Sequence, residues 1–263
     1  MKLGLEGKSV AVTGASKGIG EGLVRAFAAE GAHVHLIART RAGLDALAGE
    51  MRERFPGQRF EVHAGDLAQA PDRARVAEAI REVDVLVNNA GAIPGGSVDE
   101  ITTEQLRQAW ELKVFGYIDL SRAAYLRMRE RGSGVILNNI GNSGAHVDAA
   151  YIAGSAGNAS LIAFTKALGG PSLDHGVRVL GVNPGPVRTE RMVTLMRNRA
   201  LRTLGDAQRH AELQAHLPAA RPASVAEVAD VIVFLASERA SYVSGTVLTI
   251  DGGAGSRGSI YAR

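Results

Sequence analysis

Short apolar runs that alternate with helical segments are the feature that most restricts what this chain can fold into. The runs are rich in β-branched residues and lie at 8–14, 33–39, 59–66, 84–91, 134–141, 177–185 and 245–253. Between them the spacing is helical, as at Leu44, Leu47, Met51 and Phe55. Strict alternation of strands and helices indicates a parallel sheet with helices on both faces. No linker-like segment interrupts it, so the sequence predicts one α/β domain.

Composition excludes several functional classes. The chain has 263 residues and no cysteine, so it has neither disulfides nor thiolate metal sites. Its net charge is +3 with dispersed basic residues, which argues against a nucleic-acid tract. No run reaches the roughly 18 apolar residues of a membrane span, and the start lacks a signal-peptide core. The histidines lack ligand spacing such as H-E-x-x-H, so no metal site is predicted. We expect a cytoplasmic protein.

A glycine-rich loop follows the first predicted strand and opens a helix. In "VTGASKGIG", Gly14 permits a tight turn, Gly18 lets the backbone approach a phosphate, and Gly20 lets the helix pack close to the strand. The N–H groups at such a helix start attract a pyrophosphate. A purely structural turn is the alternative. The strand–turn–helix context favours dinucleotide binding through the loop residues Gly14, Ser16, Lys17, Gly18, Ile19 and Gly20.

The charge beyond the second strand indicates which dinucleotide binds. An NAD site usually has an acidic residue about 20 residues after the glycine loop, to hold the ribose 2′-OH. This chain has no Asp or Glu from Gly31 to Leu44 and instead carries Arg39 and Arg41, with Lys17 in the loop. A guanidinium pairs with a phosphate through two hydrogen bonds. The sequence favours NADP(H) over NAD(H), unless Arg39 and Lys17 are ordinary surface cations.

Five motifs, taken together, resemble the short-chain dehydrogenase/reductase family. They are "TGASKGIG" (13–20), "DL" (66–67), "NNAG" (88–91), "NPGPVRT" (183–189) and "YVSGTVLTIDGG" (242–253), in that order along nearly the whole chain. The resemblance implies a single-domain Rossmann fold with a doubly wound, seven-stranded parallel sheet and a nicotinamide cofactor. It also implies a dimer or tetramer formed through the helices at 103–130 and 149–169. The further cofactor contacts it implies are Asp66, Leu67, Asn88, Ala90, Gly91, Pro184, Gly185, Val187 and Thr189.

The family's catalytic residues are Asn, Ser, Tyr and Lys, and this chain departs from the pattern. Tyr151 matches the Tyr of Y-x-x-x-K and is expected to exchange a proton with the substrate oxygen and to contact the cofactor. The Lys position is Ser155, which carries no charge. An unassisted phenol titrates near ~10, so Tyr151 would be a poor base near neutrality. It could still donate a proton in the reductive direction.

The family's Ser falls in "IGNSGAH". Counted from the strand, the position is Asn142, and Ser143 follows it. Either side chain could hydrogen-bond a carbonyl, and we favour Ser143. His146 is close in sequence but is interpreted as a loop residue facing solvent. Lys166 lies three helical turns beyond Ser155 and is interpreted as structural.

Lys113 stands at the position of the family's Asn. Its helical neighbours Leu106, Ala109, Tyr117 and Leu120 are apolar or aromatic, so its side chain should point inward. A snorkelling lysine or a subunit ion pair is the ordinary interpretation. The alternative hypothesis is that Lys113 supplies the ammonium missing at Ser155 and lowers the pKa of Tyr151.

Two functional interpretations follow. The first is an NADP(H)-dependent enzyme that interconverts a carbonyl and a secondary alcohol of a small molecule. The second is a cofactor-binding protein without turnover, because several catalytic positions are substituted. The irregular, Arg-rich segment 186–222 is predicted to form a lid over the carboxyl ends of the strands, where open α/β sheets bind ligands. A solvated helical excursion is the alternative.

Overall fold

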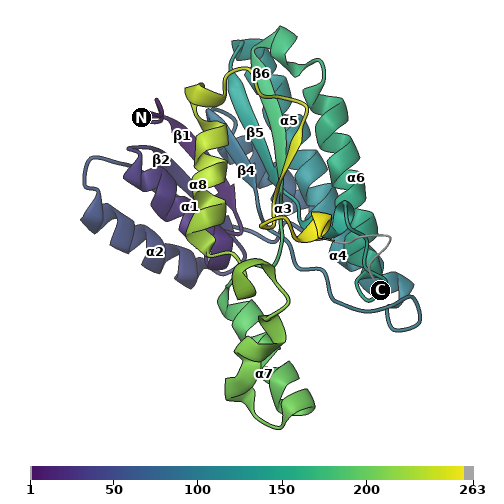
Figure 1. Cartoon of the computed structure of the whole chain (residues 1–263). Helices are drawn as coiled ribbons and strands as arrows, with labels where there is room; N and C mark the ends of the chain where they lie inside the picture. The colour runs from purple at the N-terminus through teal and green to yellow at the C-terminus, as the bar shows by residue number, and fades with distance from the viewer. Residues whose placement is uncertain (1, 258–263) are drawn as a thin grey trace.

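The computed structural model describes residues 2–257 and contains one seven-stranded parallel sheet (Figure 1). The strand order is β3-β2-β1-β4-β5-β6-β7. Within the described residues, no helix is both long and apolar enough to cross a membrane. The strands are β1 (Ser9–Thr13), β2 (His33–Ala38), β3 (Phe60–Ala64), β4 (Val85–Asn88), β5 (Gly134–Asn139), β6 (Val177–Pro184) and β7 (Val247–Ile250). The α-helices are α1 (Gly18–Ala29), α2 (Arg41–Arg54), α3 (Ala70–Ala79), α4 (Thr103–Trp110), α5 (Gly116–Arg131), α6 (Ile152–Gly169), α7 (Glu190–Leu204) and α8 (Val225–Ala236).

Strand order reverses at the pair β1–β4, which makes this the switch point of the doubly wound sheet. All six strand pairs are parallel, so every strand ends at the same edge. Ligands of such sheets bind beyond the carboxyl ends at the switch point. The predicted fold is confirmed, and it brings the loops after β1 and β4 together.

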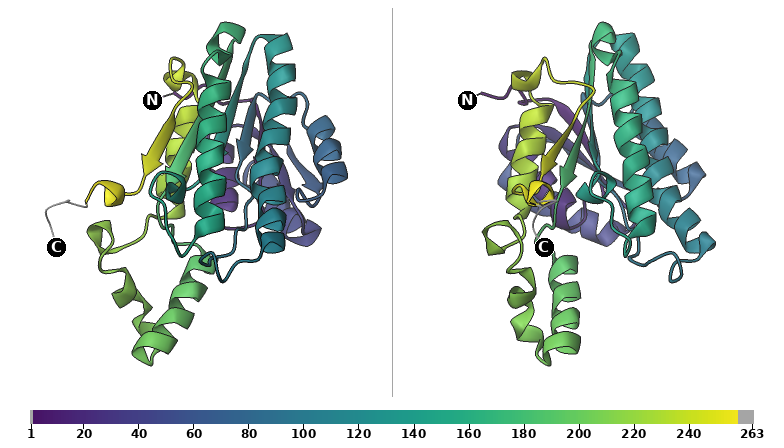
Figure 2. Two further views of the ribbon diagram at one scale, coloured as in Figure 1. Left: turned by 90° about the vertical axis from the view of Figure 1, so that its right-hand side faces the viewer. Right: turned by 45° about the vertical axis from the view of Figure 1, so that its right-hand side comes forward.

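The helices bury the two faces of the sheet against separate hydrophobic clusters (Figures 1 and 2). One face packs against α1, α2 and α8, whose buried residues include Phe27, Leu44 and Ile232. The other packs against α3 and α5 through residues such as Val76 and Leu120. The central strands β1, β4, β5 and β6 are therefore largely apolar on both sides, as their sequences indicate.

Both long helices expected from the sequence differ in detail from the prediction. The first is interrupted by a single π-turn, Glu111–Phe115, between α4 and α5. The second begins at Ile152, because Tyr151 has the non-helical dihedrals φ −141° and ψ 46°. Single π-turns inside helices occur frequently at functional sites, and Lys113 lies within this one.

Segment 186–222 extends from the body beyond the end of β6 (Figures 1 and 2). Much of it is helical: α7 packs against a second helical stretch, Ala207–Gln214, before the chain returns to α8. On the return, Ala219 and Ala220 have φ values of 52° and 55°. A residue that carries a Cβ adopts this left-handed backbone conformation at an energetic cost.

Candidate active site

The glycine loop adopts a shape that only glycine permits. Gly14 and Gly18 have φ values of +68° and +61°. A Cβ at Gly20 would lie 2.0 Å from the backbone oxygen of Gly14, so the start of α1 can pack this tightly only without a side chain. Lys17 precedes α1 and provides no side-chain cap. The first amides of α1 are left for a ligand such as a pyrophosphate.

A hydrogen-bonded clamp holds the loop after β4 against the glycine loop. The Thr13 hydroxyl accepts from the backbone N–H groups of Asn89 and Ala90 at 2.8 and 2.9 Å. The Asn89 amide donates back to the Thr13 carbonyl at 2.9 Å. A Cβ at Gly14 would lie 2.9 Å from the Ala90 Cα. The residues at the switch point thus fit a dinucleotide: a cradle free of side chains, a helix start and a rigid adjoining loop.

The structure places most of the expected cofactor contacts around this cradle. Arg39 is exposed directly after β2, and Asp66 follows β3, its carboxylate accepting from the Ala68 N–H at 3.1 Å. From the end of β6, Pro184 and Gly185 lead to Val187 and Thr189. A Cβ at Gly18 would lie 3.3 Å from the Thr189 methyl group, so this segment reaches the glycine loop.

Asn88 does not turn its side chain toward the cradle. The side chain is fully buried and donates to Ser121 Oγ and Asn138 Oδ1, each at 2.9 Å. Asn88 is the last residue of β4, so its backbone lies where the strand meets the loop beside the cradle. The expected cofactor contact at Asn88 stays a prediction, and in this arrangement the backbone would make it.

Tyr151 caps α6, and its phenol ring covers the helix at Gly154. A Cβ at Gly154 would lie 1.9 Å from Tyr151 Cε1 and 2.2 Å from Cζ. The ring therefore occupies the place that a side chain from position 154 would take. Burial raises the pKa of Tyr151, and the positive charge of Arg191 partly offsets this. The phenol is protonated at neutral pH and can act as a proton donor.

Ser155 does not face Tyr151. Its hydroxyl donates to the Asp148 carbonyl at 3.3 Å and accepts from the Asp148 N–H at 3.0 Å. The sequence placed Tyr151 and Ser155 on one helical face, but Tyr151 lies before the helix and its side chain is not held to that face. Ser155 fixes the loop that delivers Tyr151.

Asn158 lies one helical turn beyond Gly154, at a buried position next to Ser143, the serine expected to polarise the substrate carbonyl. Its amide donates to Ser143 Oγ at 2.9 Å, which leaves the Ser143 hydroxyl proton free for a carbonyl oxygen. The Asn158 side-chain oxygen is buried and has no partner among the described residues. Asn142 instead donates to Asp251 Oδ2 at 3.0 Å and links this loop to the end of β7. Of the two candidates, Ser143 has a hydroxyl proton available to a carbonyl oxygen, and its catalytic role stays a prediction.

The Lys113 ammonium points inward, as its sequence position indicates, but not to Tyr151. It donates to Tyr117 Oη at 2.8 Å and to the Asn139 carbonyl at 2.7 Å. Burial lowers the pKa of Lys113 to about 7. A Cβ at Gly91 would lie 3.3 Å from Lys113 Nζ, so the ammonium lies directly beside the loop after β4. Within the described residues, Arg191 is the cation that acts on the Tyr151 phenol.

Three residues of this region escaped the sequence prediction: Gly154, Asn158 and Arg191. Gly154 and Asn158 are four residues apart, as the Tyr and Lys of the family motif are, and lie three residues after Tyr151 and Ser155. This spacing is the sequence signal that could have identified both residues. Arg191 was recognised only as part of an Arg-rich segment. His146 and Lys166 are exposed, in agreement with their interpretation as non-catalytic.

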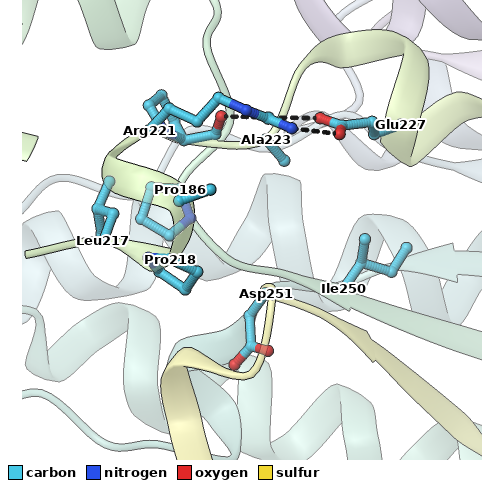
Figure 3. Close-up of a pocket in the computed structure, with 11 residues that line it drawn as sticks. Pro186, Leu217, Pro218, Arg221, Ala223, Glu227, Ile250 and Asp251 are labelled. Atoms are coloured by element: carbon cyan, nitrogen blue, oxygen red, sulfur yellow. Dashed lines mark hydrogen bonds and ion pairs between the residues drawn. The ribbon is translucent and has the colours of Figure 1, made fainter. Parts of the chain in front are cut away.

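A cavity of about 190 Å³ lies away from these residues, where the extension rejoins the body (Figure 3). It is bordered by Pro186, Leu217, Pro218 and Asp251. The ion pair between Arg221 and Glu227, 2.7 Å, closes one side. This cavity contains none of Tyr151, Ser143, Asn158 and Lys113. It belongs to the base of the extension and not to the candidate catalytic corner, the name used below for Tyr151, Gly154, Asn158, Ser143 and Lys113.

Comparison with known proteins identifies the family. The family model described as enoyl-(acyl carrier protein) reductase matches residues 14–255. Galactitol 2-dehydrogenase (L-tagatose-forming) of Cereibacter sphaeroides is 36% identical, with 95% of each chain covered. The 3-oxoacyl-(acyl-carrier-protein) reductase FabG of Escherichia coli is 32% identical, covering 95% of this chain and 98% of that protein.

Solved structures agree with the sequence comparison. The crystal structure of L-sorbose reductase from Gluconobacter frateurii, complexed with NADPH and L-sorbose, superposes with a TM-score of 0.91 at 32% identity. It covers 97% of this chain and 98% of that one. Together with the glycine cradle at the switch point, these matches show an NAD(P)-binding oxidoreductase, and the chain belongs to the short-chain dehydrogenase/reductase family.

Proposed function

We propose that this protein reduces a small-molecule ketone to a secondary alcohol with NADPH, and that Tyr151 is its proton donor. The observation that carries the proposal is the Tyr151 ring standing in the side-chain space above Gly154. Gly154 lies one helical turn before Asn158, which donates to Ser143, so the phenol lies about one turn from a hydroxyl that can polarise a carbonyl. The carbonyl–alcohol chemistry of the relatives supports the same class of reaction.

Three side chains of the protein have separate roles in the proposed reaction. Ser143, whose oxygen accepts from Asn158, donates a hydrogen bond to the substrate carbonyl oxygen and polarises it, while keeping its own proton. Tyr151 then protonates the developing alkoxide, and Arg191 stabilises the phenolate that remains. The bound nicotinamide supplies the hydride. Because burial raises its pKa, Tyr151 is suited to donate a proton at neutral pH, which is its role in the reductive direction.

Lys113 is assigned to the cofactor side of the site. Its ammonium lies beside Gly91, where the resemblance places the path of the nicotinamide half. Two acceptors, Tyr117 and Asn139, hold the side chain in place. We propose that Lys113 binds the cofactor ribose directly and does not contact the phenol. The hypothesis from the sequence had Lys113 reach both Tyr151 and the cofactor ribose, and the present proposal keeps only the ribose.

Two features support NADPH over NADH. Arg39 is exposed after β2 and Lys17 lies in the glycine loop, so both side chains are free to meet a 2′-phosphate. The relatives solved with cofactor include L-sorbose reductase with NADPH and a gluconate 5-dehydrogenase with bound NADP. The sugar and polyol substrates of such relatives suggest a polyhydroxylated ketone. We further propose that segment 186–222, which carries Arg191, closes over the bound substrate.

The test is Tyr151→Phe, assayed by NADPH oxidation with ketoses such as L-sorbose and L-tagatose. Loss of the proton donor should lower kcat by about 10²–10⁴-fold while NADPH affinity stays unchanged. Tyr242→Phe, at a residue that is 93% exposed, is the control and should retain activity. Wild-type protein that binds NADPH but reduces no ketone would favour the alternative of a cofactor-binding protein without turnover.

A further inference from the structure

A second cluster of titratable side chains lies on β2 and β3, outside the catalytic corner. In the parallel register His35 pairs with Glu61, and Ile37 pairs with His63. Side chains alternate along a strand, so His35, Glu61 and His63 all project from one face of the sheet. β3 is the edge strand. The sheet geometry therefore gathers three potential metal ligands that are far apart in sequence.

The spacing of the three ligand atoms suits a small metal ion. His35 Nδ1 lies 3.0 Å from His63 Nε2 and 3.7 Å from Glu61 Oε2. All three ligand atoms lie within 4.8 Å of one another. Zinc–ligand bonds of about 2.0–2.1 Å in tetrahedral geometry separate two ligand atoms by roughly 3.3 Å. A modest side-chain rotation would bring all three atoms to that spacing.

A hydrogen bond on the far side of the His35 ring supports the same orientation. Ser9 Oγ lies 3.0 Å from His35 Nε2. In the tautomer that donates from Nε2 to Ser9, the lone pair of Nδ1 points to His63 and Glu61. Metal-binding histidines are usually fixed by such an outer hydrogen bond. Ser9 is itself fixed, because its N–H donates to Asp84 Oδ2 at 2.8 Å.

Charge and access around the three side chains are compatible with metal binding. The charges of Arg59 and Arg75 would oppose a cation, whereas the Glu61 carboxylate favours one. The Glu61 side chain is 52% exposed, which gives an ion and its waters a path to the site.

We propose that His35, Glu61 and His63 bind one divalent transition-metal ion, Zn²⁺ or Ni²⁺, with water completing the coordination. Two imidazoles and one carboxylate form a recognised donor set for such ions. The ion joins the edge strand β3 to β2. It stabilises the fold and takes no part in hydride transfer.

The experiment uses full-length protein without a histidine tag, freed of metal by a chelator. Zn²⁺ is titrated calorimetrically, Co²⁺ serves as a spectroscopic probe, and melting temperature is measured with and without Zn²⁺. We expect one ion per chain, and a rise in Tm of about 5–10 °C at a hundredfold excess over the Kd. NADPH affinity should stay the same.

Variants decide whether these side chains are the ligands. His63→Gln and Glu61→Gln should each weaken Zn²⁺ binding by about 100-fold, and Ser9→Ala by about tenfold. His33→Gln, two residues before His35 on the same strand, is the control and should bind as the wild type does. If wild-type protein shows no saturable binding, or if all variants bind equally well, the proposal fails. Glu61→Gln alters an exposed side chain, so this comparison survives even if a histidine variant does not fold.

Discussion

The cofactor cradle and the catalytic corner lie at the same edge of the sheet but are built differently. The cradle consists of backbone: Gly14, Gly18 and Gly20 leave space, and Thr13 fastens the neighbouring loop. The catalytic corner consists of side chains that different elements deliver, such as Tyr151 before α6 and Lys113 from a π-turn. A backbone site tolerates few changes, whereas a side-chain site can be rearranged with its chemistry kept.

The largest expected effect breaks the cradle. Gly20→Ala places a methyl group 2.0 Å from the Gly14 carbonyl, an obstruction made of backbone that cannot move aside. We expect a loss of about 3 kcal/mol in the free energy of unfolding and loss of NADPH binding. Chemical denaturation and fluorescence titration with NADPH measure the two effects.

Gly49→Ala is the matched control for that substitution. Gly49 is also helical, but a Cβ there meets nothing within 4 Å. The same change should stabilise the protein by about 0.5–1 kcal/mol, since alanine loses less entropy in a helix. Equal effects of the two substitutions would show that the glycine loop is not sterically constrained.

The next largest expected effect is a gain in stability together with a loss of function at the catalytic corner. Lys113→Met removes a buried ammonium whose pKa is lowered from 10.5 to about 7. The Asn139 carbonyl keeps its 2.9 Å hydrogen bond from Tyr117. The free energy of unfolding of the variant at pH 7 should therefore be about 1–3 kcal/mol larger than that of the wild type. Turnover and cofactor affinity should fall, because Lys113 lies beside Gly91.

The pH dependence of that stability gain has a definite sign. Between pH 7 and 10.5 the unfolded chain holds the Lys113 proton while the folded chain releases it, so wild-type stability rises with pH. The advantage of Lys113→Met should shrink from pH 7 to pH 10 in thermal melts. Lys166→Met, at an exposed lysine, should show no such trend. A constant advantage would contradict a Lys113 pKa that burial lowers to about 7.

The smallest expected effect concerns the cradle and tests which cofactor it prefers. Arg39→Ala should weaken NADPH binding by about tenfold and leave NADH binding unchanged, because only the 2′-phosphate contact is lost. Arg41→Ala is the control, since Arg41 is paired with Asp45 at 3.3 Å. Equal losses for both cofactors would exclude Arg39 as the 2′-phosphate contact.

Local patterns were predictable from sequence, and contacts across the fold were not. The glycine loop and the strands carry short-range signals, so the sheet and the cradle were expected correctly. The inward direction of Lys113 followed from helical periodicity, but its partners Tyr117 and Asn139 depend on the packing of α5 against β5. The four-residue spacing of Tyr151 and Ser155 predicted that both side chains lie on one helical face. The helix begins at Ile152, one residue after Tyr151, so the prediction does not hold for Tyr151. The cluster of His35, Glu61 and His63 arises only from strand register.

The central claim is that Tyr151 delivers its phenol to the place of a side chain from Gly154. Moving the phenol along the chain tests it most directly: NADPH oxidation is measured for Tyr151→Ala and for the triple variant Tyr151→Ala, Gly154→Tyr, Asn158→Lys. The triple variant restores the Tyr–Lys spacing of the family in the register of the helix. We predict that Tyr151→Ala is inactive and that the triple variant recovers at least about tenfold over it. A triple variant that binds NADPH as tightly as the wild type but stays as inactive as Tyr151→Ala would contradict the account.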